Sequence, residues 1–334
     1  MSAKTIILHI SDLHIRNDKC ECFERTVLFD TFIKQVKSEC ESRHRPEIII
    51  VTGDIAYSGI RTEYEFAGEF LETLIKNLGY ENDRLFIVPG NHDVNRRKYR
   101  PSDVPVYKDM NHLNRELGNY RFRDDLLKGM TEYFKFVEEL CPHLKPVQRN
   151  LIPFVSNYAT SCGKNIGLLG LNSAWMCRKS PDQGEIAIGE YQMNAAEAEM
   201  RKMNPFDLLL CIMHHPIQYL WYQDREIFRS YLSGGNAIVL CGHLHEPTGI
   251  SMDDLSGRLV QLQSGSLYST KKLLQPSKYY YLTIDWEYSR IEMDFRAFDP
   301  MKRKWYIDCM TGIDGHIGFD MFNAKSSYLK SGYP

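Results

Sequence analysis

Histidine, aspartate and asparagine side chains recur at five places where an apolar stretch of the sequence stops. The segments are Asp12-Leu13-His14, Gly53-Asp54, Gly90-Asn91-His92-Asp93, His214-His215 and Gly242-His243-Leu244-His245. They offer carboxylates, imidazoles and one carboxamide, a mixture that suits divalent manganese, iron, zinc or cobalt better than calcium or magnesium alone. Glycine precedes Asp54, Asn91 and His243, so the backbone can turn tightly at these positions and direct the polar groups inward. The sequence therefore predicts a metal site.

The number of these side chains favours two metals over one. A single ion takes about four to six ligands. Two ions about 3.5–4 Å apart, bridged by one carboxylate and a hydroxide, would use the full set. The seven candidate ligands are Asp12, His14, Asp54, Asn91, His214, His243 and His245.

Buried strands must bring these segments together. Apolar, β-branched runs at residues 5–10, 47–52 and 84–88 end at the first three segments, and apolar residues recur at helical spacing in residues 23–40 and 63–78. Continuous apolar strands separated by helices predict a parallel sheet that is buried on both faces. The polar segments would then converge beyond the carboxyl ends of the strands.

The rest of the chain divides into an insertion, more strands and a tail. Residues 95–150 are charged, aromatic and helical in pattern, which predicts a cap inserted between two strand-rich regions. Further strands are expected at residues 166–171, 207–213 and 237–241, followed by an antiparallel series that ends near residue 308. We expect one domain over residues 1–310, with the helical insertion at 95–150, and a C-terminal tail at 311–334.

Composition excludes several classes of protein. Hydrophobic residues are 43% of the chain and charged residues 25%, as in an ordinary globular protein. The net charge of -2 argues against a strongly basic nucleic-acid binder. The 9 cysteines are scattered without a CxxC pair, which is typical of free thiols in a reducing compartment. With no signal-peptide pattern and no apolar run of about 18 residues, we expect a cytoplasmic protein without a membrane span.

The five segments, in this order, resemble the calcineurin-like metallophosphoesterase family. The family pattern is D-x-H, G-D, G-N-H-D/E, H and G-H-x-H, and the resemblance spans residues 5 to about 247. One such motif alone would be a weak signal, but five in order, each after a predicted strand, are specific. The resemblance implies an α/β fold, a four-layer αββα sandwich of two mixed sheets flanked by helices, with a helical cap insertion.

The resemblance also implies a role for each residue. Three ligands would hold one metal, three the other, and one carboxylate would bridge them: Asp12, His14 and His245; Asn91, His214 and His243; and Asp54. His92 would stand beside the leaving-group oxygen as general acid or electrostatic stabiliser, and Asp93 would orient its ring. A hydroxide bridging two divalent metals would attack phosphorus in line.

Substrate contacts are expected from Asn91, His215 and Arg16. We favour His214 as the ligand, because the family places the ligand first after the apolar strand, and His215 as a phosphate contact, with the reverse assignment as the alternative. Arg16 follows His14 closely enough to bind phosphate.

The motifs do not choose the substrate. The residue three after the bridging aspartate, acidic in several family members, is Tyr57 here, and the protein serine/threonine phosphatase motif is absent. We interpret the chain as a phosphodiesterase for a nucleotide or another small diester. The alternative is a DNA or RNA nuclease within a defence or repair assembly, for which Tyr99 and Tyr107 of the cap could stack bases. We favour an ordinary solvated cap. A non-catalytic scaffold is disfavoured because every ligand is present. No protein partner can be named.

Overall fold

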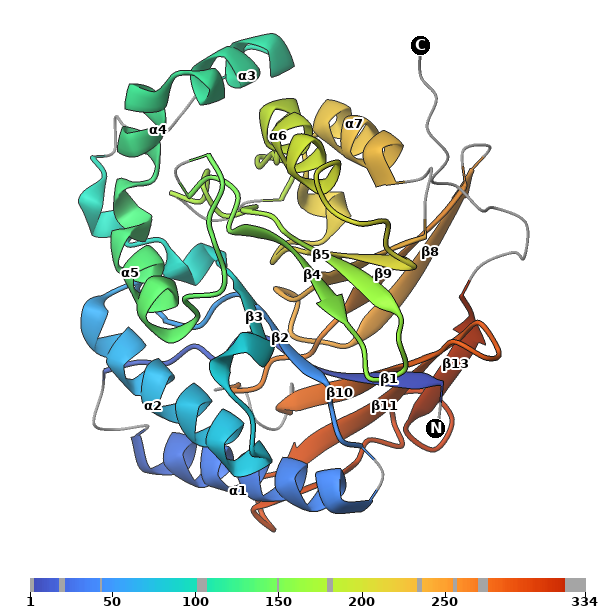
Figure 1. The fold of residues 1–334 in the computed structure, drawn as a ribbon. Helices are drawn as coiled ribbons and strands as arrows, with labels where there is room; N and C mark the ends of the chain where they lie inside the picture. The colour runs from blue at the N-terminus through green and yellow to red at the C-terminus, as the bar shows by residue number, and fades with distance from the viewer. Residues whose placement is uncertain are drawn as a thin grey trace.

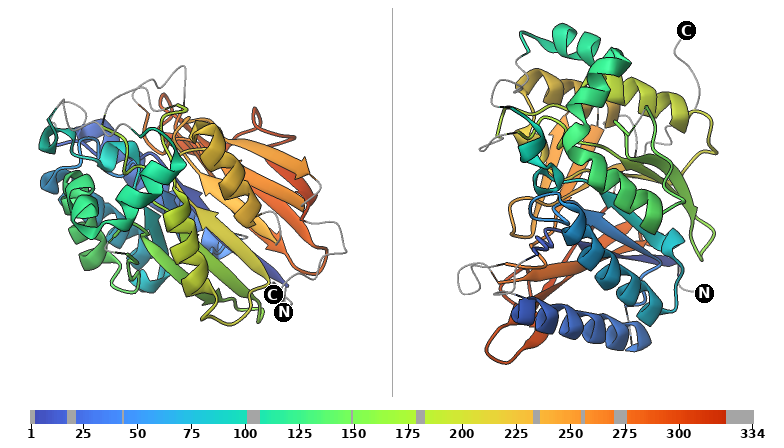
Figure 2. Two further views of the ribbon diagram at one scale, coloured as in Figure 1. Left: turned by 90° about the horizontal axis from the view of Figure 1, so that it is seen from above. Right: turned by 90° about the vertical axis from the view of Figure 1, so that its left-hand side faces the viewer.

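Two β-sheets pack face to face, and helices cover the outer face of each (Figures 1 and 2). The computed structural model describes residues 3–17, 22–42, 44–100, 107–148, 150–178, 183–232, 236–254, 257–269 and 276–321. In Figure 1 the layers run from α1 and α2 at the bottom, through the two sheets, to α6 and α7 at the top. This is the αββα sandwich that the sequence predicts.

The first sheet is built around the N-terminal strand. Its strand order is β12-β11-β10-β1-β2-β3, and β13 also pairs with β11. β1, β2 and β3 run parallel, and the remaining pairs are antiparallel. The strands are β1 (Lys4–Ile10), β2 (Ile48–Thr52), β3 (Leu85–Val88), β10 (Lys278–Asp285), β11 (Arg290–Asp299), β12 (Lys304–Ile307) and β13 (His316–Asp320). Helices α1 (Cys22–Ser42) and α2 (Arg61–Leu78) connect the parallel strands.

The second sheet has the order β4-β5-β6-β7-β9-β8. Its four central strands are parallel, and an antiparallel strand lies at each edge. The strands are β4 (Phe154–Ala159), β5 (Asn165–Gly170), β6 (Leu208–Ile212), β7 (Ala237–Cys241), β8 (Thr248–Asp254) and β9 (Gly257–Gln263). Helices α6 (Glu190–Met200) and α7 (Tyr222–Leu232) cover its outer face (Figure 1).

Both faces of the central strands are buried. On β6, Leu210 belongs to the core between the sheets, whereas Cys211 packs in the core under the outer helices. On β7, Ile238 and Val239 alternate in the same way. Double-sided burial explains why these strands are continuous apolar runs in the sequence.

The inserted segment is helical and bridges the two outer layers. It contains α3 (Met110–Gly118), α4 (Tyr120–Leu126) and α5 (Thr131–Leu140). α5 packs on α2 and α3 packs on α6, so the insertion closes one side of the sandwich (Figure 1). Short 3-10 turns complete the described elements: η1 (Asn82–Arg84), η2 (Asn91–Asp93), η3 (Arg96–Lys98), η5 (Lys128–Met130) and η6 (Ile217–Tyr219).

Two strands were not expected from the sequence. β4 and β13 both pair antiparallel at a sheet edge, where most of their side chains are only partly buried or exposed. Such strands lack the continuous apolar run on which the expectation rested. β13 lies within residues 311–334, the segment that we expected to be a tail.

The described helices and cysteines add two observations. Each helix in the described ranges is too short or too polar to cross a membrane. The cysteines with described side chains, which include Cys211 and Cys241 in the core, are free thiols.

A buried ion pair fastens α1 to the first sheet and gives a test of the packing. The Nε of Arg296 lies 2.6 Å from Oε1 of Glu39, and Arg296 is only 5% exposed. Glu39→Ala leaves a buried guanidinium without its partner, so we expect the free energy of unfolding to fall by about 3–5 kcal/mol in urea denaturation. The matched exposed pair is Arg61 with Glu65, for which Glu65→Ala should cost less than about 1 kcal/mol. Equal effects of the two substitutions would contradict this account.

Candidate metal centre

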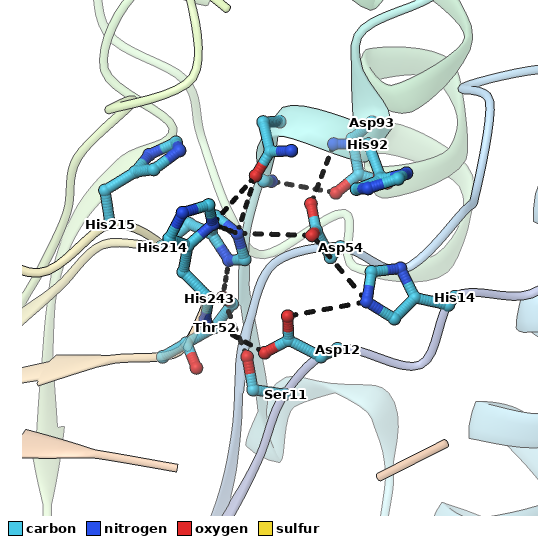
Figure 3. A network of polar contacts seen from close by, with 12 residues as sticks. Ser11, Asp12, His14, Thr52, Asp54, His92, Asp93, His214, His215 and His243 are labelled. Carbon is cyan, nitrogen blue, oxygen red and sulfur yellow. Dashed lines mark hydrogen bonds and ion pairs between the residues drawn. The ribbon is translucent and has the colours of Figure 1, made fainter. Parts of the chain in front are cut away.

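The side chains of the polar segments meet in one network of contacts (Figure 3). Beyond the ends of β1 and β2 the two chains stay paired: the amide of Asp12 donates to the carbonyl of Gly53 at 3.0 Å, and that of His14 to the carbonyl of Asp54 at 2.9 Å. This backbone pairing fixes the first two segments side by side. The expected convergence at the carboxyl ends of the strands is therefore present.

One group of ligand atoms comes from Asp12, His14 and His245. The Nε2 atoms of His245 and His14 lie 3.2 Å and 3.6 Å from Oδ1 of Asp12, and 3.1 Å from each other. Asp12 is fully buried, and its Oδ1 has no hydrogen-bond partner. A buried carboxylate oxygen with two imidazole nitrogens facing it fits a divalent cation.

A second group comes from Asn91, His214 and His243. Oδ1 of Asn91 lies 3.1 Å from Nε2 of His214 and 3.0 Å from Nδ1 of His243, and the two imidazole nitrogens are 3.2 Å apart. Two imidazoles and a carboxamide oxygen can hold a second cation of the same kind.

Asp54 lies between the two groups (Figure 3). Its Oδ2 is 3.3 Å from Nε2 of His214 and 3.9 Å from Nε2 of His14. Its Oδ1 accepts a hydrogen bond from the backbone amide of His92 at 2.8 Å. The carboxylate therefore faces both sets of donors at once.

Backbone strain is concentrated in these segments. Five of the seven candidate ligands have a positive φ, between 45° and 77°, namely Asp12, His14, Asp54, His243 and His245. Non-glycine residues rarely adopt this left-handed region, and such residues cluster at functional sites. The geometry of the donors is thus held at a cost that the surrounding fold must offset.

Two glycines permit the close approach of the segments. A Cβ at Gly90 would collide with the carboxylate of Asp54, and a Cβ at Gly242 would collide with Ser11 and lie 2.7 Å from Oδ2 of Asp12. Both glycines are required by space, and neither has a positive φ.

Burial and the neighbouring carboxylates shift the pKa values of the site histidines in opposite directions. Burial alone would lower the pKa of His214, but the neighbouring carboxylates of Asp54 and Asp12 outweigh it and raise this pKa to about 9. Burial lowers the pKa of His14 and of His243 to about 4, so both rings are neutral near pH 7. Neutral imidazoles are the form that binds a metal.

The structure distinguishes the two adjacent histidines. Nδ1 of His214 is 2.7 Å from the carbonyl of Thr52, which fixes the tautomer that presents Nε2 to the site. The ring of His215 instead has partners on both nitrogens, with Nδ1 2.9 Å from Oγ of Ser173 and Nε2 3.7 Å from Sγ of Cys177. The geometry therefore favours His214 as the ligand, with His215 beside it.

The expected contact between Asp93 and the His92 ring is wrong. Nδ1 of His92 is 2.8 Å from the carbonyl of Tyr57. The Asp93 carboxylate is buried and accepts hydrogen bonds from the amides of Gly90 at 2.8 Å and Ala56 at 3.0 Å, and from the Tyr64 hydroxyl at 3.0 Å. Asp93 therefore fixes the loop that carries His92, and the Tyr57 carbonyl contacts the His92 ring. Burial and the charge of Asp54 raise the pKa of Asp93 to about 6.

The aromatic residues of the cap are engaged within the protein. The ring of Tyr99 is stacked against a guanidinium, and its hydroxyl accepts a backbone N–H of the insertion at 2.9 Å. Tyr107 packs against Trp175, with ring centroids 6.0 Å apart. Arg96 lies close enough to the site for its charge to add to burial in lowering the pKa of His215.

Sequence reasoning missed the residues that support the ligands. Thr52 and Tyr57 act through backbone carbonyls, which any residue provides, so no residue type marks them. Ser173 reaches His215 from a segment that is distant in the sequence. The position of Tyr57, three after Asp54, was visible only as a departure from the family pattern.

Comparison with known proteins agrees with this geometry. A family model described as calcineurin-like phosphoesterase matches residues 5–247. The chain belongs to the calcineurin-like phosphoesterase family. Members of this family usually bind divalent metals, and the His and Asp clusters of this chain could hold them.

The similar proteins are distant. The chain is 23% identical over 271 residues to the "uncharacterized metallophosphoesterase-like protein YydB" of Bacillus subtilis (strain 168), covering 79% of this chain and 54% of that protein. It is 22% identical over 129 residues to the "probable glycerophosphodiester phosphodiesterase GpdQ" of Arcobacter nitrofigilis, covering 37% and 45%. The chain thus spans about half the length of the curated relatives it matches. A crystal structure of a "predicted phosphoesterase" from Streptococcus pneumoniae TIGR4 aligns over 96% of this chain and 99% of that one, at 14% identity and a TM-score of 0.33.

The contact between Gly90 and Asp54 gives a test of the site. Gly90→Ala places a methyl group in the space of the Asp54 carboxylate, so the carboxylate must move away from one group of ligands. We expect the number of Mn²⁺ ions bound per chain, measured by elemental analysis after desalting, to fall while the far-ultraviolet circular dichroism stays unchanged. Gly68→Ala is the control, because a Cβ there meets nothing closer than 3.8 Å. Full manganese content in Gly90→Ala would contradict the packing described here.

The raised pKa of His214 predicts how metal binding depends on pH. Below about pH 9 this imidazole carries a proton that a metal must displace. Apparent Mn²⁺ affinity should therefore rise with pH, by up to about tenfold per unit below pH 9, and binding should release a proton. Calorimetry in two buffers of different ionisation enthalpy measures that proton. An affinity that is flat from pH 6 to pH 9 would show that His214 is not displaced.

Proposed function

We propose that this chain is a phosphodiesterase that requires two divalent metals and acts on a nucleotide or another small diester. The observation that carries the proposal is the position of Asp54, whose carboxylate faces two separate groups of ligand atoms. A shared carboxylate between two cations is the arrangement used for in-line attack on phosphorus. Manganese, iron, zinc and cobalt all suit these ligands.

The side chains divide the work of hydrolysis. Two cations, when bound, would supply positive charge for the phosphoryl oxygens and acidify the attacking water molecule. The residues that would hold them are Asp12, His14 and His245 on one side and Asn91, His214 and His243 on the other, with Asp54 shared. Asn91 would bind a non-bridging phosphate oxygen, and Arg16 would bind phosphate from the side of His92. Both ring nitrogens of His215 already have protein partners, so a phosphate contact from His215 requires one of them to be released.

His92 is suited to protonate the leaving group. Its Nδ1 faces the carbonyl of Tyr57, so Nδ1 carries the hydrogen and Nε2 is the nitrogen that can exchange a proton with substrate. The ring lies next to His14, with centroids 4.7 Å apart, at the edge of the site. The buried Asp93 carboxylate accepts hydrogen bonds from backbone amides of the surrounding loops and so fixes the position of His92.

A small diester is favoured over nucleic acid as the substrate. A nuclease of the kind considered above would use aromatic rings of the cap to stack bases. Tyr99 and Tyr107 both pack within the protein, so they support the structural role of the cap. The distant glycerophosphodiester phosphodiesterase relative is a second reason to place a diester first. The cytoplasm remains the expected compartment, and nucleic acid and protein partners remain hypotheses.

Hydrolysis of a panel of esters tests the function. Mn²⁺-dependent turnover should be faster for bis-p-nitrophenyl phosphate than for p-nitrophenyl phosphate or single-stranded DNA. Turnover of DNA without turnover of the small diesters would support the nuclease alternative. No metal-dependent turnover of any substrate, cyclic nucleotides included, would exclude the enzymatic function.

His92→Ala tests the role of the leaving-group acid. A positioned acid contributes about 10²- to 10⁴-fold to kcat, and the contribution grows when the leaving group needs a proton. We expect a loss of that order for an alkyl leaving group and a smaller loss for p-nitrophenolate, which departs without protonation. His112→Ala, in the cap, is the control and should change neither rate. Equal losses for the two leaving groups would show that His92 is not the acid.

Asp54→Asn tests the shared carboxylate directly. An amide keeps the shape of the side chain but removes the charge that both ligand groups face. Occupancy of both metals should fall, as counted by elemental analysis. Two metals still bound per chain would rule out a bridging role.

A further inference from the structure

A stack of three side chains extends outward from His92. The ring of Tyr57 lies 4.9 Å from the ring of His92, and the guanidinium carbon of Arg16 lies 3.5 Å from the centroid of the Tyr57 ring. The stack therefore continues the site past the group that would protonate the leaving oxygen. The stack starts at the side of the site from which the leaving group would depart.

The backbone holds this stack in place. The pairing that carries Asp12 and Asp54 into the site continues outward, with the amide of Ile15 donating to the carbonyl of Ile55 at 2.9 Å and the amide of Tyr57 donating to the carbonyl of Ile15 at 3.0 Å. Arg16 and Tyr57 are the next side chains along the two strands of this pairing. Among the described residues the Arg16 guanidinium forms no ion pair, and it lies over the Tyr57 ring.

A second arginine lies behind Arg16. Arg25, in the first turn of α1, donates from Nη2 to the backbone carbonyl of Arg16 at 2.7 Å. Arg25 is 6% exposed, and its Nη1 is buried without a hydrogen-bond partner. The Arg25 guanidinium carbon also lies 5.8 Å from the centroid of the Tyr268 ring, so Arg25 is held as a buried positive charge directly behind the backbone of Arg16.

Both arginines line one groove. It has a volume of about 580 Å³ and runs from Ile15, Arg16 and Asn17 between α1 and α2, past Phe29 and Phe66. Asp30 and Glu69 line it as well. Asp30 lies five residues beyond Arg25 on α1, which is about 7.5 Å along a helix, so the charge of the lining changes sign within a short distance.

We propose that Arg16 and Arg25 form a subsite for a second anionic group, carried on the leaving side of the substrate. The inference rests on the proposed function for the position of the scissile phosphate. The Arg16 guanidinium binds one tetrahedral anion, such as a terminal phosphate, at the mouth of the groove, and the buried Arg25 adds positive charge behind it. The carboxylates beyond them repel a continuing polyanion, which selects a short diester with one further phosphate over a long nucleic acid. Tyr57 is the positioning residue that keeps the Arg16 guanidinium flat against the site.

Anion binding tests the subsite without hydrolysis. Sulfate is titrated calorimetrically into the full chain loaded with Mn²⁺, and into Arg16→Gln and Arg25→Gln. Loss of one charge-assisted contact should weaken sulfate binding at least about tenfold. The control is Arg61→Gln, which removes an equal charge from an exposed position on α2 and should leave the affinity unchanged. Sulfate affinity that is the same in the wild type and in Arg16→Gln would overturn the subsite.

Three dinucleotides test whether the enzyme recognises a second phosphate on its substrate. The dinucleotide dTpdT is compared with pdTpdT and with dTpdTp, which carry a second phosphate on one nucleoside or the other. The wild type should prefer one of the phosphorylated forms at least about tenfold in kcat/KM, mainly through KM, and Arg16→Gln should lose that preference. Tyr57→Phe should keep the preference, because the stack is kept, and Tyr57→Ala should reduce it.

The failures of the two proposals are distinct. Hydrolysis with the same preference in the wild type and Arg16→Gln would overturn the subsite and leave the phosphodiesterase in place. Sulfate binding lost in Arg16→Gln, without hydrolysis of any diester, would overturn the proposed function and leave the anion site. Because Arg16 is partly exposed, its variant tests the proposal even if Arg25→Gln does not fold.

Discussion

The candidate metal centre is arranged around one buried carboxylate that faces two sets of candidate ligands. Asp54 is 1% exposed, and its two oxygens contact His214, His14 and the amide of His92. Asp12, also buried, adds a second negative charge nearby. Two buried carboxylates can stay ionised together only when positive charge compensates them. The raised pKa of His214 is one response to this constraint, and two divalent cations would be the complete one.

The surrounding structure offsets the cost of this arrangement. Five candidate ligands have left-handed backbone angles, and Gly90 and Gly242 allow contacts that a Cβ would prevent. Parallel strands with both faces buried supply the rigid layers from which these loops extend. The hydrogen-bonded pairing that continues past β1 and β2 then carries the order outward to Arg16 and Tyr57. The candidate metal centre and the proposed anion subsite thus lie at two ends of one pair of hydrogen-bonded backbone segments.

The sequence predicted the elements whose pattern is dense and missed those whose pattern is sparse. Continuous apolar runs marked β1, β2, β3, β6 and β7, and each was followed by the polar residues that meet in the structure. The half-exposed edge strands β4 and β13 had no such run. The candidate ligands could be predicted from the sequence because their side-chain types are those that bind metals. The contact between the His92 ring and the Tyr57 carbonyl could not be predicted, because every residue has a backbone carbonyl. The role of Arg25 could not be predicted either, because its buried, unpartnered nitrogen is visible only in the folded structure.

The most direct test of the account is the position of two metals around Asp54. Crystals grown with Mn²⁺ give anomalous scattering that locates each ion. The account predicts two peaks about 3.5–4 Å apart, one beside Asp12, His14 and His245 and one beside Asn91, His214 and His243, with the Asp54 carboxylate touching both. A single peak, or two peaks that do not share Asp54, would contradict it.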